Sequence, residues 1–69
     1  MTVQLRINGT LAREDVATIA ELLRGRGVDP AARFVAVAVN GAVVGRGAWA
    51  DFHLADGDEV EIVRPLQGG

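Results

Sequence analysis

The sequence predicts an α+β fold in which a mixed sheet of four to five strands is crossed on one face by a single main helix. Three observations support this prediction. Alternating apolar residues lie near both ends of the chain, two Asn-Gly pairs mark hairpin turns, and an amphipathic segment with helix-capping residues lies between those pairs. One domain is expected, because 69 residues are too few for two hydrophobic cores.

The N-terminal segment predicts a hairpin. Apolar and polar residues alternate there with the period of two that is typical of a strand with one buried face, the apolar members being Val3, Leu5 and Ile7. We therefore expect a strand over residues 2–7. Asn8-Gly9 follows directly, and both residues tolerate the positive φ angles of a two-residue hairpin turn. A short strand over residues 10–13 should then return along an edge of the sheet.

The helix is expected to begin at a capping box in residues 18–21. In this motif the Thr18 hydroxyl accepts a hydrogen bond from the amide three residues later, and the Glu21 carboxylate reaches back to the Thr18 amide. One helix face then carries an apolar stripe that should pack on the sheet, formed by Ile19, Leu22 and Leu23. Gly25 or Gly27 should end the helix in a left-handed conformation.

The second half of the chain begins with its most β-prone run, residues 34–39. Both faces of this run are apolar, which predicts a central strand. Its valines share one face, and the other face carries Phe34, Ala36 and Ala38. Asn40-Gly41 repeats the hairpin pattern, so a brief fourth strand should follow at residues 43–44.

The remaining residues of the domain complete the sheet. Residues 48–52 should form a helical turn or tight loop, in which Trp49 packs at the edge of the core. A turn at Asp56-Gly57-Asp58 leads into the last strand, whose buried face carries Val60 and Ile62. If the first and last strands lie side by side in the middle, the helix covers both. This is the β-grasp, or ubiquitin-like, arrangement.

A short tail follows the predicted domain. We expect a β-grasp domain over residues 1–64 and a flexible tail over residues 65–69, because Pro65 cannot continue a strand. Gly68 and Gly69 place no side chain beside the terminal carboxylate, which could therefore enter a narrow channel. The expected chemistry is activation of the Gly69 carboxylate by a partner, with Gly68 and Gln67 recognised next to it.

Composition argues against several other classes of function. The seven basic residues are scattered and the net charge is -2, so a nucleic-acid partner is not expected. Cysteine is absent and His53 is the only histidine, which leaves no metal site of ordinary composition and no nucleophile-base pair. The N-terminus does not resemble a signal peptide, and no apolar run approaches the ~20 residues of a membrane span, so we expect a cytoplasmic protein.

Several motifs occur in combination along nearly the whole chain: Asn8-Gly9, the helix start at residues 18–23, Val37-Ala38-Val39-Asn40-Gly41, Trp49, residues 54–63 and Gly68-Gly69. With this combination the chain resembles the ThiS family, the bacterial sulfur carriers of thiamin biosynthesis. The Gly-Gly end and the Asp-Gly-Asp strand entry also occur in MoaD, the carrier for molybdopterin. The Asn-Gly turn, the tryptophan and Gln67 before the glycines fit ThiS better.

The resemblance implies a carrier and not an enzyme. A ThiF-type enzyme would adenylate the Gly69 carboxylate with ATP and Mg, which the partner uses and this chain does not bind. A sulfurtransferase or cysteine desulfurase system would then replace AMP to give a thiocarboxylate. The sulfur would finally pass to a thiazole synthase of the ThiG type.

A docking face for the adenylating enzyme is expected beside the tail. The second face of the run at residues 34–39 is only modestly hydrophobic, and such a surface can be offered to a partner. The candidate docking residues are Phe34, Ala36, Ala38, Val63 and Arg64. Three alternatives remain open: a carrier for molybdopterin or another sulfur-containing metabolite, a ubiquitin-like protein modifier, and a non-covalent interaction module.

Overall fold

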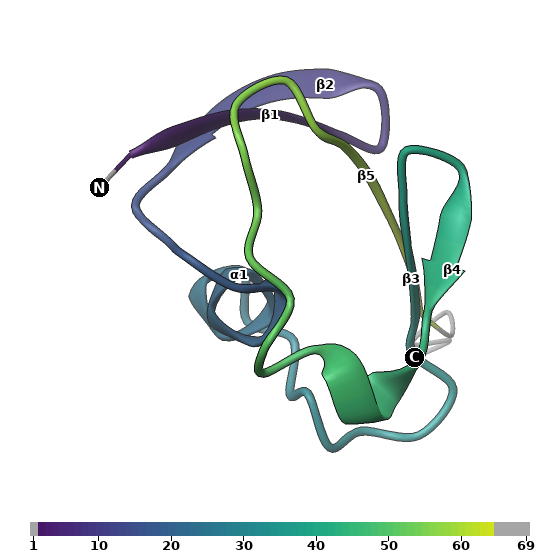
Figure 1. The fold of residues 1–69 in the computed structure, drawn as a ribbon. Helices are drawn as coiled ribbons and strands as arrows, with labels where there is room; N and C mark the ends of the chain where they lie inside the picture. The colour runs from purple at the N-terminus through teal and green to yellow at the C-terminus, as the bar shows by residue number, and fades with distance from the viewer. Residues whose placement is uncertain (1, 65–69) are drawn as a thin grey trace, which may run out of the picture.

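The computed structural model describes residues 2–64 and contains one mixed sheet with an α-helix against one face (Figure 1). The sheet curves around the helix, so the core lies between them (Figure 1). The elements in chain order are β1 (Val3–Ile7), β2 (Thr10–Glu14), α1 (Ile19–Gly25), β3 (Ala36–Val39), β4 (Ala42–Val44), the 3₁₀ helix η1 (Arg46–Ala48) and β5 (Glu59–Val63). No helix within residues 2–64 is long and apolar enough to cross a membrane.

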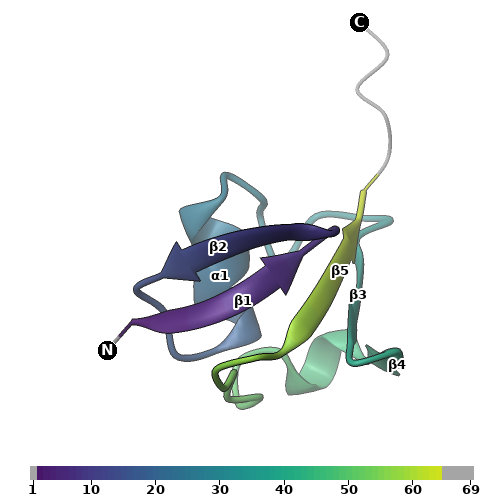
Figure 2. The ribbon, with the colours of Figure 1, turned by 90° about the horizontal axis from the view of Figure 1, so that it is seen from above.

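The strand order is β2-β1-β5-β3-β4, which places the last strand in the middle of the sheet (Figure 2). Strands β1 and β5 are parallel, whereas the other neighbouring pairs are antiparallel. The predicted β-grasp is therefore confirmed, including the edge position of β2. Strand β3 is an interior strand, flanked by β5 and β4, but the central position belongs to β5.

The core follows the predicted apolar pattern. Its fully buried side chains come from the inner faces of three strands and from the helix stripe, and the largest are Leu5, Ile19, Leu22, Leu23, Val37 and Val60. Burial of one such side chain contributes about 1.5–3 kcal/mol. Trp49 follows η1 and is 3% exposed. Its indole Nε1 donates to the Val44 carbonyl at 2.9 Å, which confirms the predicted packing role and satisfies its polar atom.

Helix α1 begins almost as expected. Thr18 Oγ1 accepts from the Glu21 amide at 3.2 Å. The Glu21 carboxylate, however, accepts from the Ala17 amide at 2.7 Å, so the predicted bond to the Thr18 amide is wrong by one residue. The chain enters the helix alongside residues 52–54, where the Ile19 amide donates to the Phe52 carbonyl. This tertiary pairing sets the entry path and turns the Ala17 amide toward Glu21.

The helix ends in a Schellman motif. The Val28 amide donates to the Leu23 carbonyl at 2.8 Å, and the Gly27 amide donates to the Arg24 carbonyl at 3.1 Å. Gly27 has φ 78°, so it is the left-handed residue, whereas Gly25 is still helical. Of the two glycines proposed from the sequence, Gly27 therefore ends the helix.

The predicted strand at residues 34–39 starts later than expected. Phe34 has φ 66°, a left-handed conformation that no strand residue adopts, and β3 begins only at Ala36. The apolar alternation of this run did not reveal the turn, because a bulky aromatic residue is an unusual occupant of the left-handed region. Alternation then holds through β3, in which Val37 and Val39 are buried.

Candidate functional site

The candidate site surrounds the point at which the predicted tail joins the domain. Strand β5 ends at Val63, and Arg64 is the last described residue. The tail is therefore attached to the central strand of the sheet. The predicted modification and recognition residues Gly69, Gly68 and Gln67, with the rest of residues 65–69, lie outside the described residues.

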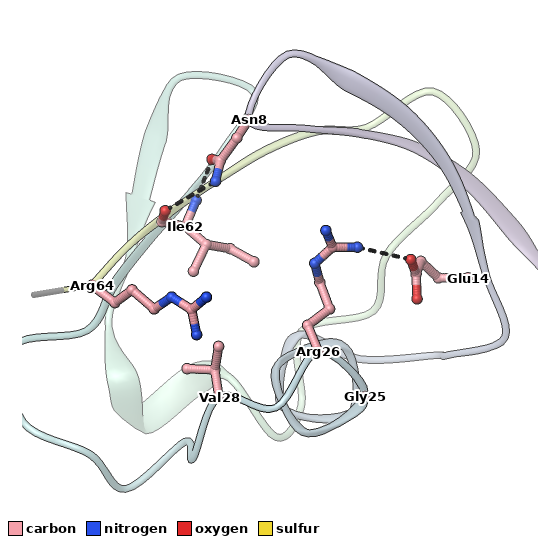
Figure 3. Close-up of a pocket in the computed structure, with 7 residues that line it drawn as sticks. All are labelled: Asn8, Glu14, Gly25, Arg26, Val28, Ile62 and Arg64. Carbon is pink, nitrogen blue, oxygen red and sulfur yellow. Dashed lines mark hydrogen bonds and ion pairs between the residues drawn. The ribbon is translucent and has the colours of Figure 1, made fainter. Parts of the chain in front are cut away.

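Asn8 holds the end of β5 that leads to the tail. The parallel pairing of β1 and β5 is short, and its last pair is Ile7 with Val60. Beyond that pair, Asn8 Oδ1 accepts from the Ile62 amide at 2.9 Å and Asn8 Nδ2 donates to the Ile62 carbonyl at 3.2 Å (Figure 3). The Asn8 side chain thus takes the place of a neighbouring strand, close to the tail attachment.

Asn40 holds the opposite end of β5. Its side-chain Oδ1 accepts from the Glu59 amide at 2.9 Å, and its backbone amide donates to the Glu59 carbonyl at 2.7 Å. Asn8 and Asn40 have φ 49° and 52°, and each precedes a glycine with positive φ. The sequence predicted both turns. It did not show that each turn also holds one end of the central strand, because that role depends on which segment lies beside the turn.

The sheet face opposite α1 carries an exposed apolar surface at this end. Ala36 lies opposite Val63, and Ala38 lies opposite Val43 on one side and Glu61 on the other. Val63 is 62% exposed and Val43 is 79% exposed. The structure therefore brings together three of the five predicted docking residues, Ala36, Ala38 and Val63. It adds Val43, whose position beside Ala38 depends on the register between β3 and β4 and could not be predicted from the sequence.

The other two predicted docking residues lie apart from this strand face. Phe34 precedes β3 and is 78% exposed. Arg64 alternates with Val63, and its side chain lies on the same side of β5 as Ile62 (Figure 3). The expectation that Arg64 shares one surface with Ala36 and Val63 is therefore not met, because successive side chains of an extended chain point to opposite faces.

Arg64 instead lines a pocket of about 330 Å³ between the C-terminal end of α1 and the end of β5 (Figure 3). The lining residues are Asn8, Glu14, Gly25, Arg26, Val28, Ile62 and Arg64. Arg26 Nη1 pairs with Glu14 Oε2 at 3.0 Å. The lining contains the guanidinium groups of Arg26 and Arg64 and the carboxylate of Glu14, so it carries a net positive charge. The tail attachment therefore separates a cationic pocket from an apolar face.

The other side chains that were considered for a chemical role, His53, Asp56 and Asp58, make polar contacts within the domain. His53 is exposed, and its Nδ1 lies 3.1 Å from the Asp51 carbonyl oxygen. The Asp56 and Asp58 carboxylates accept from the amides of Gln4 and Ala55, at 2.8 and 2.9 Å, which supports the turn into β5. Within residues 2–64, no group of three or more histidine, cysteine, aspartate or glutamate side chains is placed to hold a metal ion.

The fold and the tail attachment define a class of protein, the small ubiquitin-like β-grasp proteins whose central strand leads into the C-terminal tail. Comparison with known proteins gives the family. The sequence model of the ThiS family matches residues 4–69, and the chain belongs to this family.

Solved structures agree with this assignment. The chain is 34% identical to a thiamine biosynthesis protein (ThiS) from Geobacter metallireducens, with a TM-score of 0.77 to its crystal structure. The likeness covers 97% of this chain and 100% of that one. An NMR solution structure of a thiamine biosynthesis protein from the same organism is also 34% identical, with a TM-score of 0.76 and coverage of 97% and 88%. No curated protein matches the chain.

Proposed function

We propose that the protein carries sulfur in thiamin biosynthesis, as a thiocarboxylate on Gly69. The observation that carries this proposal is the ThiS family match, which runs over residues 4–69 and so includes both terminal glycines. The similarity to two thiamine biosynthesis structures supports the same pathway. The carrier would act in the cytoplasm, together with the enzymes that load and unload it.

The proposed chemistry takes place at the carboxylate. The Gly69 carboxylate attacks the α-phosphorus of ATP bound with Mg to a ThiF-type enzyme, which releases pyrophosphate and forms an acyl adenylate. The terminal sulfur of a protein persulfide, formed by a sulfurtransferase or cysteine desulfurase system, then displaces AMP to give an acyl disulfide. A thiol cleaves this acyl disulfide, which leaves the thiocarboxylate on the carrier and a new disulfide on the donor. The thiocarboxylate is a good nucleophile and passes its sulfur to a ThiG-type thiazole synthase. In this scheme the carrier is a cosubstrate, and the partner enzymes supply the acids and bases.

The geometry of the tail attachment supports docking of the adenylating enzyme at this end of the sheet. Residues 65–69 span at most about 17 Å even when fully extended. An enzyme whose active site receives Gly69 must therefore lie close to the end of β5. The exposed apolar face formed by Ala36, Ala38, Val43 and Val63 is available there. We propose that this face forms part of the docking surface.

The direct test is an intact-mass measurement after incubation with a ThiF-type enzyme, ATP, Mg and a sulfide source. A mass increase equal to one oxygen-to-sulfur exchange is expected. A chain truncated before Gly68 should show no change. An unchanged mass with an enzyme that activates another carrier would contradict the proposal. Covalent conjugates to lysine that depend on Gly69 would instead favour a protein modifier.

A further inference from the structure

Phe34 combines two features that are unfavourable in a free domain. Its backbone is left-handed at φ 66°, a conformation that bulky residues rarely adopt. Its side chain is 78% exposed, so the ring contributes little to the core. Asparagine and glycine fit such a backbone better, and within residues 2–64 asparagine occupies the two other left-handed positions that are not glycine. The stability of the free domain therefore gives no reason for phenylalanine here.

The loop that carries Phe34 is held in place by Arg46. The Arg46 guanidinium donates to the carbonyl oxygens of Pro30 and Ala32. The same group lies 4.8 Å from the centroid of the buried Trp49 ring, which fixes its position through a cation–π contact. The backbone that leads to Phe34 is thus hydrogen-bonded to the domain at two positions in the free protein, and such contacts reduce the entropy lost on binding.

Phe34 also lies at the end of the sheet from which the tail departs. It precedes Ala36 by two residues, and Ala36 pairs with Val63 directly before Arg64. A partner that binds residue 69 through a tail reaching about 17 Å must cover this end. The enzyme that receives the tail is therefore the partner best placed to contact the Phe34 ring.

We infer that Phe34 is the anchor that inserts into an apolar pocket of the adenylating enzyme, and that Arg46 positions it. The inference rests on the proposed function and deepens it by naming the contact that selects the partner. Large aromatic side chains presented from an ordered backbone are typical of residues that dominate binding. The strain at Phe34 is then retained for recognition.

The test compares Phe34→Asn with Leu11→Thr in the full chain. Leu11 is 58% exposed. It pairs with Arg6, which in turn pairs with Glu59, so Leu11 lies level with the end of β5 that is away from the tail. Two quantities are measured, the melting temperature and the KM of each chain as substrate in adenylation by a ThiF-type enzyme. Phe34→Asn should raise the melting temperature by about 4 °C. It should also raise KM about tenfold. Leu11→Thr should leave KM unchanged.

The outcomes separate this inference from the proposed function. An unchanged KM for Phe34→Asn, with the wild-type chain adenylated normally, would overturn the anchor and leave the carrier function standing. A lower melting temperature for Phe34→Asn would also overturn the inference, since Phe34 would then stabilise the free domain. Failure of an active ThiF-type enzyme to adenylate the wild-type chain would overturn the proposed function and the anchor with it.

Discussion

The Asn8 side chain hydrogen-bonds both backbone groups of Ile62, accepting from its amide at 2.9 Å and donating to its carbonyl at 3.2 Å. A hairpin-turn residue thereby continues the pairing of β5 past the point where β1 ends. At the other end of the strand, Asn40 Oδ1 accepts from the Glu59 amide, and the Asn40 backbone amide donates to the Glu59 carbonyl. The central strand, which leads to the tail, is held at both ends by turn side chains.

We predict that Asn8→Gly lowers the free energy of unfolding by about 1–2 kcal/mol, through loss of both hydrogen bonds. Glycine tolerates φ 49° at least as well as asparagine, so the turn itself is retained. Thermal denaturation followed by circular dichroism measures the change. Asn8→Asp keeps the acceptor but turns a second acceptor oxygen toward the Ile62 carbonyl, so it should also lose stability. A wild-type melting temperature for Asn8→Gly would show that the contact with Ile62 contributes nothing.

Gly25 and Gly27 provide a matched pair for the end of the helix. Gly27→Ala should destabilise the domain by about 1 kcal/mol, because its φ of 78° is strained for any residue with a Cβ. Gly25 lies in the helix, where an added Cβ would meet nothing within 4 Å. Gly25→Ala should therefore stabilise the domain by about 0.5–1 kcal/mol. Urea denaturation of both variants checks the opposite signs. Equal effects would contradict the Schellman motif.

Ala38→Lys tests the proposed docking face. Ala38 lies opposite Glu61, so a lysine there gains a favourable cross-strand neighbour and should leave the melting temperature nearly unchanged. The same charge on an apolar docking face should raise the KM for adenylation about tenfold. Ala55→Lys, near the start of β5, serves as the control and should have the wild-type KM. Identical kinetics for both variants would remove this face from the interface.

Arg46→Ala tests the attachment of the loop before β3. The change removes the hydrogen bonds to Pro30 and Ala32 and the contact with Trp49, and should lower stability by about 1–2 kcal/mol. Arg46→Lys keeps a cation over the ring but lacks the planar fork that reaches two carbonyls, so it should be intermediate. Hydrogen exchange at residues 32–35 should accelerate in Arg46→Ala. Unchanged exchange there would mean that the loop is held by other contacts.

Local patterns in the sequence determined much of the fold. Alternation predicted the buried faces of β1 and β5, because side-chain direction in a strand depends only on parity. Both Asn-Gly turns and the Thr18 cap were predictable, since each depends on the conformational preferences of a few adjacent residues. The tail chemistry was also proposed from local residues, the glycines at positions 68 and 69.

Tertiary structure decided the features that depend on contacts between distant segments. The pairing of Asn8 with Ile62 joins residues 54 positions apart, and no local pattern specifies it. Phe34 is left-handed although the local β-preference of residues 34–39 predicts an extended backbone. It follows a loop that is held by Arg46, a residue distant in sequence. Alternation alone places Arg64 on the same side of β5 as Ile62, but the pocket that Arg64 lines exists only because the C-terminal end of α1 lies on that side. The sequence thus determined the elements and their faces, whereas register between strands decided which side chains surround the tail attachment, since register is set by the packing of the whole core.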